Sequence, residues 1–119
     1  MLTVTTNKTN YAVGETVVIT LTLTNDTGTT QTYNFSSSQR YDVIIGRGGN
    51  KVWQWSDGRF FAQMMGSETL QPGESRVYTV EWNQTNSAGN QVPTGTYTVV
   101  GQITSYNMPE QDSTTITIS

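Results

Sequence analysis

The chain of 119 residues contains no cysteine and no histidine. Without cysteine it cannot form a disulfide or a thiolate metal site. Without histidine it lacks the commonest general base and the commonest side-chain ligand of transition metals. A Ser-His-Asp or Cys-His catalytic site is therefore excluded, and we expect neither a metal nor a cofactor.

Basic residues and long apolar runs are also scarce. Six lysines and arginines stand against nine aspartates and glutamates, which gives a formal net charge of -3. Because the basic residues are scattered, no stripe can neutralise phosphates, and we expect neither nucleic-acid binding nor a polybasic membrane patch. The longest apolar runs span only a few residues, far fewer than a membrane-crossing helix needs.

The segment Met1–Thr5 looks like a strand and lacks the charged and apolar regions of a signal peptide. This indicates either a cytoplasmic protein or a module taken from a longer surface protein, so the compartment stays open. The length fits one domain over residues 1–119.

The abundant residues are Thr, Asn, Gln, Ser and Gly, which favour strands and turns. Thr16–Asn25 shows the clearest alternation, with Val17, Ile19, Leu21 and Leu23 on one face. The same alternation predicts strands over Leu2–Thr5, Gln31–Phe35, Arg40–Ile45, Lys51–Trp55, Arg76–Trp82, Thr96–Thr104 and Ser113–Ser119. Seven or eight short strands joined by turns predict an all-β, antiparallel β-sandwich.

The connections carry turn residues. Pro72-Gly73 fits the centre of a type II turn, where Gly accepts a positive φ. Only Gly58–Ser67 is compatible with a short helical turn, and Asn83–Gln91 is the most flexible-looking loop.

The aromatic residues cluster around Trp53 and Trp55, which share one face of a strand. We expect this face to point into the core, with Gln54 pointing outward; an outer aromatic strip that stacks on sugars is the alternative. Of Phe60 and Phe61, we expect one in the core and one partly exposed.

Acidic residues within strands are unusual. We expect Asp42 and Glu81 to face solvent or to pair with an arginine such as Arg40 or Arg76. Two carboxylates can support glycoside hydrolysis without histidine, but nothing in the sequence brings a pair together, so we expect no enzyme.

The order and spacing of several segments resemble those of the BsuPI-like family, named for the intracellular proteinase inhibitor of Bacillus. The resemblance extends from Thr16 to Thr104. The matching segments are Leu23–Asn25, Phe35–Val43, Val52–Ser56, Phe60 or Phe61 with Gln63, Leu70–Ser75, Tyr78 with Trp82, and Pro93–Tyr97.

This resemblance implies an immunoglobulin-like sandwich and a non-catalytic, protein-binding role, with a subtilisin-type serine protease as the partner. An inhibitor of this kind needs a rigid scaffold that presents an extended loop. Subtilisin-like enzymes accept large apolar side chains, so two loops are candidates, Gly58–Ser67 and Ser105–Gln111. Their candidate contact residues are Phe60, Phe61, Met64, Met65, Tyr106 and Met108.

Two other functions remain open. The Thr- and Asn-rich surface also suits an immunoglobulin-like structural or adhesion module of a bacterial surface protein. A carbohydrate-binding module would instead need at least two exposed rings on one surface among Trp53, Trp55, Trp82 and Tyr106.

Overall fold

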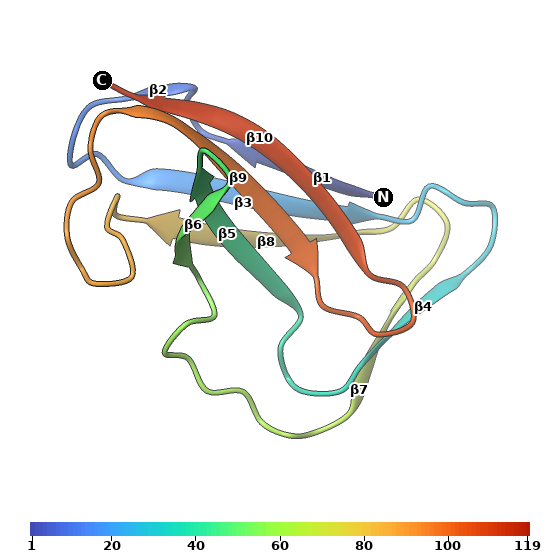
Figure 1. Ribbon diagram of the computed structural model, residues 1–119. Coiled ribbons are helices and arrows are strands. Elements are labelled where there is room, and N and C mark those ends of the chain that lie inside the picture. The colour runs from blue at the N-terminus through green and yellow to red at the C-terminus, as the bar shows by residue number, and fades with distance from the viewer.

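The computed structural model describes residues 1–119, which form ten β-strands and no helix (Figure 1). The strands are β1 (Leu2–Thr6), β2 (Asn10–Tyr11), β3 (Val17–Thr24), β4 (Gln31–Phe35), β5 (Tyr41–Arg47), β6 (Asn50–Gln54), β7 (Gly66–Leu70), β8 (Ser75–Trp82), β9 (Gly95–Ile103) and β10 (Glu110–Ile118). One sheet has the order β1-β3-β8 and the facing sheet has the order β2-β10-β9-β5-β6. A two-stranded ribbon, β4-β7, extends from one end. The all-β, immunoglobulin-like sandwich is confirmed.

Strict alternation along the strands explains why two sheets pack face to face. In β3, Val17, Ile19, Leu21 and Leu23 are all buried, while the intervening residues are half-buried on the outer face. Since successive side chains of a strand point to opposite faces, one face of each sheet supplies the core and the other meets solvent.

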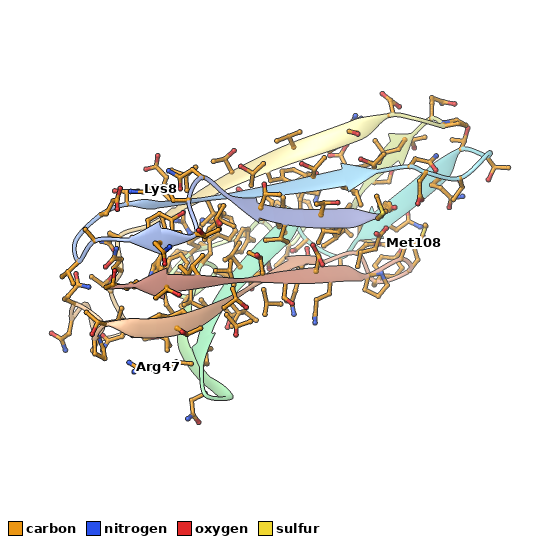
Figure 2. The ribbon with its side chains drawn as sticks, turned by 90° about the horizontal axis from the view of Figure 1, so that it is seen from above. Lys8, Arg47 and Met108 are labelled. Atoms are coloured by element: carbon orange, nitrogen blue, oxygen red, sulfur yellow. The ribbon has the colours of Figure 1, made fainter.

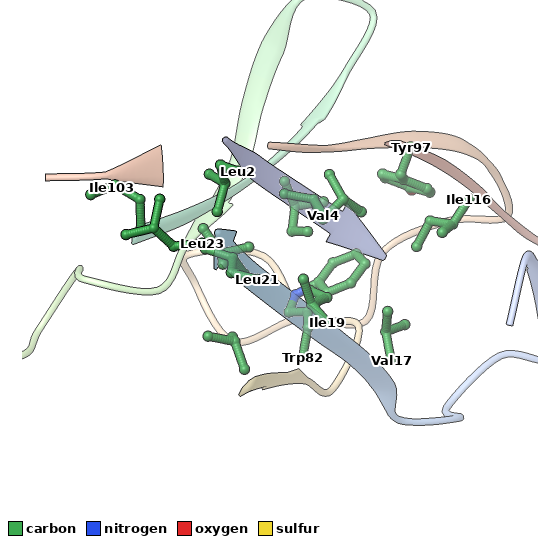
Figure 3. Packing of buried hydrophobic residues seen from close by; sticks show 14 of the residues in the cluster. Leu2, Val4, Val17, Ile19, Leu21, Leu23, Trp82, Tyr97, Ile103 and Ile116 are labelled. Atoms are coloured by element: carbon green, nitrogen blue, oxygen red, sulfur yellow. The ribbon is translucent and has the colours of Figure 1, made fainter. Parts of the chain in front are cut away.

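The core fills the space between the sheets and contains twenty buried hydrophobic residues (Figure 3). Trp82 is its largest fully buried side chain. Its ring lies 5.9 Å from that of Tyr97 in the facing sheet, and its indole N–H donates to the carbonyl of Thr85 at 2.8 Å. A core of this size, with its buried polar atoms paired, holds the sandwich without disulfides.

Two short strands lie outside the predicted set, and one predicted strand starts earlier than expected. β2 has only two residues and pairs in parallel with the end of β10, so it is too short to show a period. β7 buries only Leu70, because it pairs with β4 beyond the main core. The last strand begins at Glu110 and not at Ser113, since its first half alternates half-buried and exposed polar residues and has no apolar side chain to mark it.

The predicted turn at Pro72-Gly73 forms and fixes the start of β8. Gly73 has φ +83°, and Glu74 N–H donates to the carbonyl of Gln71 at 2.9 Å, as a type II turn requires. The side chain of Asn25 is buried and donates to the carbonyl of Leu70 at 2.9 Å. These contacts hold the β4-β7 ribbon at the end of the sandwich, where the candidate loops lie.

Candidate protein-binding site

The connection between β6 and β7, residues 55–65, carries most of the exposed apolar surface; we call it the β6–β7 loop. Phe60 is 100% exposed, Met64 70% and Met65 76%. These are three of the seven large hydrophobic side chains that are exposed in the whole chain. The other four lie at separate places, so this loop is the only concentrated apolar feature of the surface.

The root of the β6–β7 loop is tied down by the carboxylate of Asp42 on β5. Gln54 Nε2 donates to Asp42 Oδ2 at 2.6 Å, and the Ser56 hydroxyl donates to the same oxygen at 2.7 Å. The N–H of Ser56 donates to Asp42 Oδ1 at 3.1 Å. Asp42 is only 4% exposed, because the two residues that bind it also cover it.

The expectation that Asp42 faces solvent or pairs with an arginine is therefore wrong. Asp42 lies on the outer side of β5, but Gln54 and Ser56 close over it, and N–H and O–H donors take the place of a cation. Glu81, in contrast, is exposed on β8.

Trp55 is the platform for the first half of the loop. Tyr41 stacks on its ring at 4.6 Å between centroids, and the guanidinium of Arg59 lies 4.3 Å from the centroid of the Trp55 ring. Tyr41 and Arg59 therefore both lie against the Trp55 ring. Phe61 packs at its side at 5.8 Å, and Arg59 Nε donates to the carbonyl of Trp55 at 2.8 Å.

These contacts settle how the four central aromatic residues are placed. Trp53 and Trp55 are half-buried and pack against the core, which confirms the inward face predicted for them. For the phenylalanines the expectation is wrong. Phe61 is half-buried against Trp55, outside the core, and Phe60 is fully exposed.

Ser38, in the β4–β5 connection, fixes the middle of the loop. Its hydroxyl accepts a hydrogen bond from Ala62 N–H at 2.8 Å, and its own N–H donates to the carbonyl of Ala62 at 2.9 Å. On either side of this clamp, the N–H groups of Phe60, Phe61 and residues 63–65 make no hydrogen bond within the chain. The loop is therefore held at its root, through Ser56, and at its middle, through Ala62. Its backbone is extended and unbonded on both sides of Ala62.

Gly58–Ser67, the one stretch compatible with a short helical turn, does not form one. The turns lie at its start: Asp57 N–H donates to the carbonyl of Gln54 at 3.2 Å, and Arg59 N–H to that of Ser56 at 3.1 Å. The rest of the stretch runs extended into β7.

The second candidate loop, between β9 and β10, is docked on β4. Tyr106 N–H donates to the carbonyl of Asn34 at 3.0 Å, and Asn107 Nδ2 donates to that of Thr32 at 3.0 Å. Tyr106 is 56% exposed, whereas Met108 is half-buried and packs against the core. Tyr106 thus presents its side chain to solvent, and Met108 supports the hairpin from beneath.

Both candidate loops lie at the same end of the sandwich, on either side of residues 36–40 (Figure 1). Ser38 binds Ala62 of the β6–β7 loop, while the carbonyl of Arg40 accepts a hydrogen bond from Thr104 N–H at 3.1 Å. The structure therefore brings Phe60, Phe61, Met64 and Met65 together on one loop and places Tyr106 and Met108 on its neighbour.

The ionisable groups near this end are engaged in structural contacts. Burial raises the pKa of the Tyr78 hydroxyl, and the nearby carboxylate of Glu68 adds to this rise. Glu68 in turn pairs with Arg40 at 3.3 Å and Arg76 at 3.9 Å. No three acidic side chains converge as a metal site would require, and no segment forms an apolar helix long enough to cross a membrane.

Residues 4–108 match the family described as intracellular proteinase inhibitor, BsuPI. The chain belongs to the BsuPI family. The match extends from Val4 within β1 through β9 and includes the whole β6–β7 loop and the β9–β10 hairpin as far as Met108. The resemblance read from the sequence is thereby confirmed, and family membership implies a protease partner. A search of curated proteins finds no match to the chain.

Solved structures show where else this fold occurs. Spo0M, a sporulation control protein from Bacillus subtilis, is similar with a TM-score of 0.60 and 16% identity, over 99% of this chain and 48% of that one. A β-glucosidase from Erythrobacter marinus gives 0.57 and 13%, over 100% of this chain and 15% of the enzyme. The CARDB domain of a Pyrococcus furiosus protein gives 0.52 and 15%, over 99% and 92%. The BsuPI chain thus spans less than half of the first two proteins, and at these identities the likeness concerns the fold alone.

Proposed function

We propose that this BsuPI chain inhibits a subtilisin-type serine protease and that its β6–β7 loop enters the active-site cleft. The observation that carries the proposal is the combination found at Phe60: a fully exposed aromatic side chain on an extended backbone that is anchored on both sides. Family membership supports the activity, and the geometry supports the segment.

The free backbone of this loop suits a protease cleft. Such clefts bind a peptide in extended form, with main-chain hydrogen bonds for affinity and side-chain pockets for selectivity. Phe60 offers a large apolar group to one pocket, and burying a phenylalanine is worth about 1.5–3 kcal/mol. Because Asp42 and Ser38 hold the loop in advance, little conformational entropy is lost on binding.

Neighbouring residues would extend the contact. Met64 and Met65 are exposed, and unbranched thioether side chains adapt to irregular apolar surfaces. Tyr106 lies on the adjacent hairpin and would touch the rim of the cleft. Phe61 and Met108 would support the two loops from their half-buried positions. In this proposal the chain occupies the cleft and catalyses nothing.

The positions of the tryptophans favour this role over carbohydrate binding. Trp82 is fully buried, and the ring of Trp55 is already occupied by Tyr41, which stacks on it, and by the guanidinium of Arg59. Sugar rings need an open aromatic face. Of the candidate rings only the half-buried Trp53, in β6, and the exposed Tyr106, after β9, remain, and they belong to different segments.

The test is a titration of the purified protein into a subtilisin-type protease, with residual activity and the integrity of the chain followed together. We expect stoichiometric loss of activity with an intact chain. Phe60→Asp should weaken inhibition at least 30-fold, since a buried aromatic anchor contributes about 2 kcal/mol or more. Val77→Asp is the matched control, because Val77 is an exposed apolar residue on β8 outside both loops.

The possible results separate the two parts of the proposal. Inhibition that survives Phe60→Asp unchanged would remove the β6–β7 loop from the interface but leave the activity in place. Absence of inhibition by the unmodified chain, across several subtilisin-type enzymes, would refute the activity and favour a structural module.

A further inference from the structure

A groove of about 400 Å³ lies beside β6, away from the β6–β7 loop. It is formed by the β5–β6 hairpin, the β8–β9 connection and the start of β9. Its apolar wall comes from Val52, Ala88, Val92 and Pro93, and Arg47 and Tyr97 line its polar side. Arg47 and Met108 point toward opposite ends of the long axis in Figure 2, so the groove is remote from the β9–β10 hairpin.

Arg47 is held in place within this groove but has no carboxylate partner. Its guanidinium lies over the ring of Tyr97, 5.3 Å from the centroid, and Nη1 donates to the Tyr97 hydroxyl at 3.2 Å. Gly95 makes room for it: φ is +146°, and a Cβ there would lie 2.7 Å from Arg47 Nη2. Arg47 takes part in no ion pair. Arg47 is exposed, and since a guanidinium carries five N–H donors, most of them face solvent and are open to a ligand.

The other cation of the groove is already engaged. Lys51 Nζ lies 3.2 Å from Asp57 Oδ2 and donates to Gln54 Oε1 at 3.1 Å. Arg47 and Arg59 both lack an acidic partner within the chain, and of the two only Arg47 lines a groove. The groove therefore offers one free positive charge next to an apolar wall.

The walls of the groove are fixed before any ligand binds. The β8–β9 connection, which the sequence marks as flexible, is braced throughout. Ser87 N–H donates to the carbonyl of Val52 at 3.1 Å, and Asn86 Oδ1 accepts from the N–H groups of Ala88 and Asn90, each at 3.0 Å. A preformed site loses little entropy on binding, so even a small ligand can be held.

We propose that this groove binds the carboxyl terminus of a peptide that ends in a large apolar residue. The carboxylate would lie on the guanidinium of Arg47, which offers two parallel N–H donors, and the last side chain would lie against Val52 and Ala88. A single cation neutralises the one charge of a carboxylate, whereas a phosphate group carries about −1.5 to −2. The volume suits one or two residues. This site is independent of the proposed inhibitory loop.

The test uses amide chemical shifts of the full chain, titrated with N-acetyl-leucine and, as the uncharged control, N-acetyl-leucinamide. We expect saturable shifts at Val52, Ser87 and Ala88 with the carboxylate, and at least tenfold weaker binding of the amide. Arg47→Gln should weaken carboxylate binding at least tenfold. Arg59→Gln is the matched control, because Arg59 also lies over an aromatic ring without an ion pair but lines no groove.

A second variant keeps the test decisive if Arg47→Gln disturbs the fold. Ala88→Glu places a negative charge at the exposed rim and should abolish carboxylate binding while leaving the remaining amide spectrum unchanged. Three results would overturn the proposal: equal shifts with the amide, no saturable shifts up to the solubility limit, or stronger binding of inorganic phosphate at the same amides.

Discussion

Removing the carboxylate of Asp42 should cost the protein a substantial part of its stability, although Asp42 lies on a solvent-facing side of its sheet. In Asp42→Ala, Gln54 Nε2, the Ser56 hydroxyl and the N–H groups of Val43 and Ser56 all lose their acceptor. The two side-chain donors can turn toward water, but the two backbone N–H groups are fixed by the fold. An unsatisfied buried donor costs about 1–3 kcal/mol, so we expect a loss of about 2–4 kcal/mol in the free energy of unfolding.

Urea unfolding followed by tryptophan fluorescence measures this loss. With an m-value of about 2 kcal/mol/M, the midpoint should fall by about 1–2 M urea at unchanged m. Asp42→Asn should lose less, since Gln54 and Ser56 can reorient toward an amide. Glu81→Ala, at an exposed strand position without an ion pair, is the control and should change stability by less than about 0.5 kcal/mol. If Asp42→Ala behaved like this control, the reasoning about the loop root would be refuted.

Three further predictions follow from single contacts. Ser38→Ala removes the acceptor of Ala62 N–H, and limited proteolysis with mass spectrometry should show faster cleavage within residues 60–65, while global stability falls by only about 1 kcal/mol. Burial, and then a hydrogen bond to a carboxylate, raises the pKa of Tyr33 well above its ordinary value of about 10. The unfolded chain therefore loses this proton first, so stability is complete below about pH 10 and falls at higher pH, and Tyr33→Phe should flatten that fall in unfolding titrations. Gly101→Ala would place a Cβ 2.5 Å from Val4 Cγ2 across the core, and thermal unfolding should report a loss of about 1–3 kcal/mol; an unchanged midpoint would contradict this packing argument.

The sequence predicts the sandwich well because period-two alternation marks strands with one buried face. Val17–Thr24 and Ser75–Trp82 show this pattern over eight residues each, and both strands form. β7 escapes prediction for the same reason: in Gly66–Leu70 only Leu70 is buried, so no hydrophobic period exists to detect.

The anchors of the candidate loop depend on contacts between distant segments, which local patterns do not encode. Ser38 and Ala62 are 24 residues apart, and Asp42 and Ser56 are 14 apart. A serine or an aspartate of this kind looks like an ordinary polar residue until the register of β5 and β6 is known. The sequence does mark the loop itself through the adjacent residues Phe60 and Phe61, because adjacent apolar residues on a loop cannot all face inward.

The two proposed sites share β6 but should work independently. Arg47 and Val52 lie beside the start and middle of the strand, and the β6–β7 loop begins after its last residue, Gln54. Both direct links come from Lys51, which pairs with Asp57 and donates to Gln54 Oε1, and exposed contacts of this kind contribute only about 0–1 kcal/mol. Arg47→Gln should therefore leave protease inhibition within about twofold, and Phe60→Asp should leave carboxylate binding unchanged. The double variant, Arg47→Gln with Phe60→Asp, tests this independence. If its inhibition constant differed from the product of the two single effects by more than about fivefold, β6 would couple the sites. That result would overturn the view that the loop's anchors alone determine its geometry.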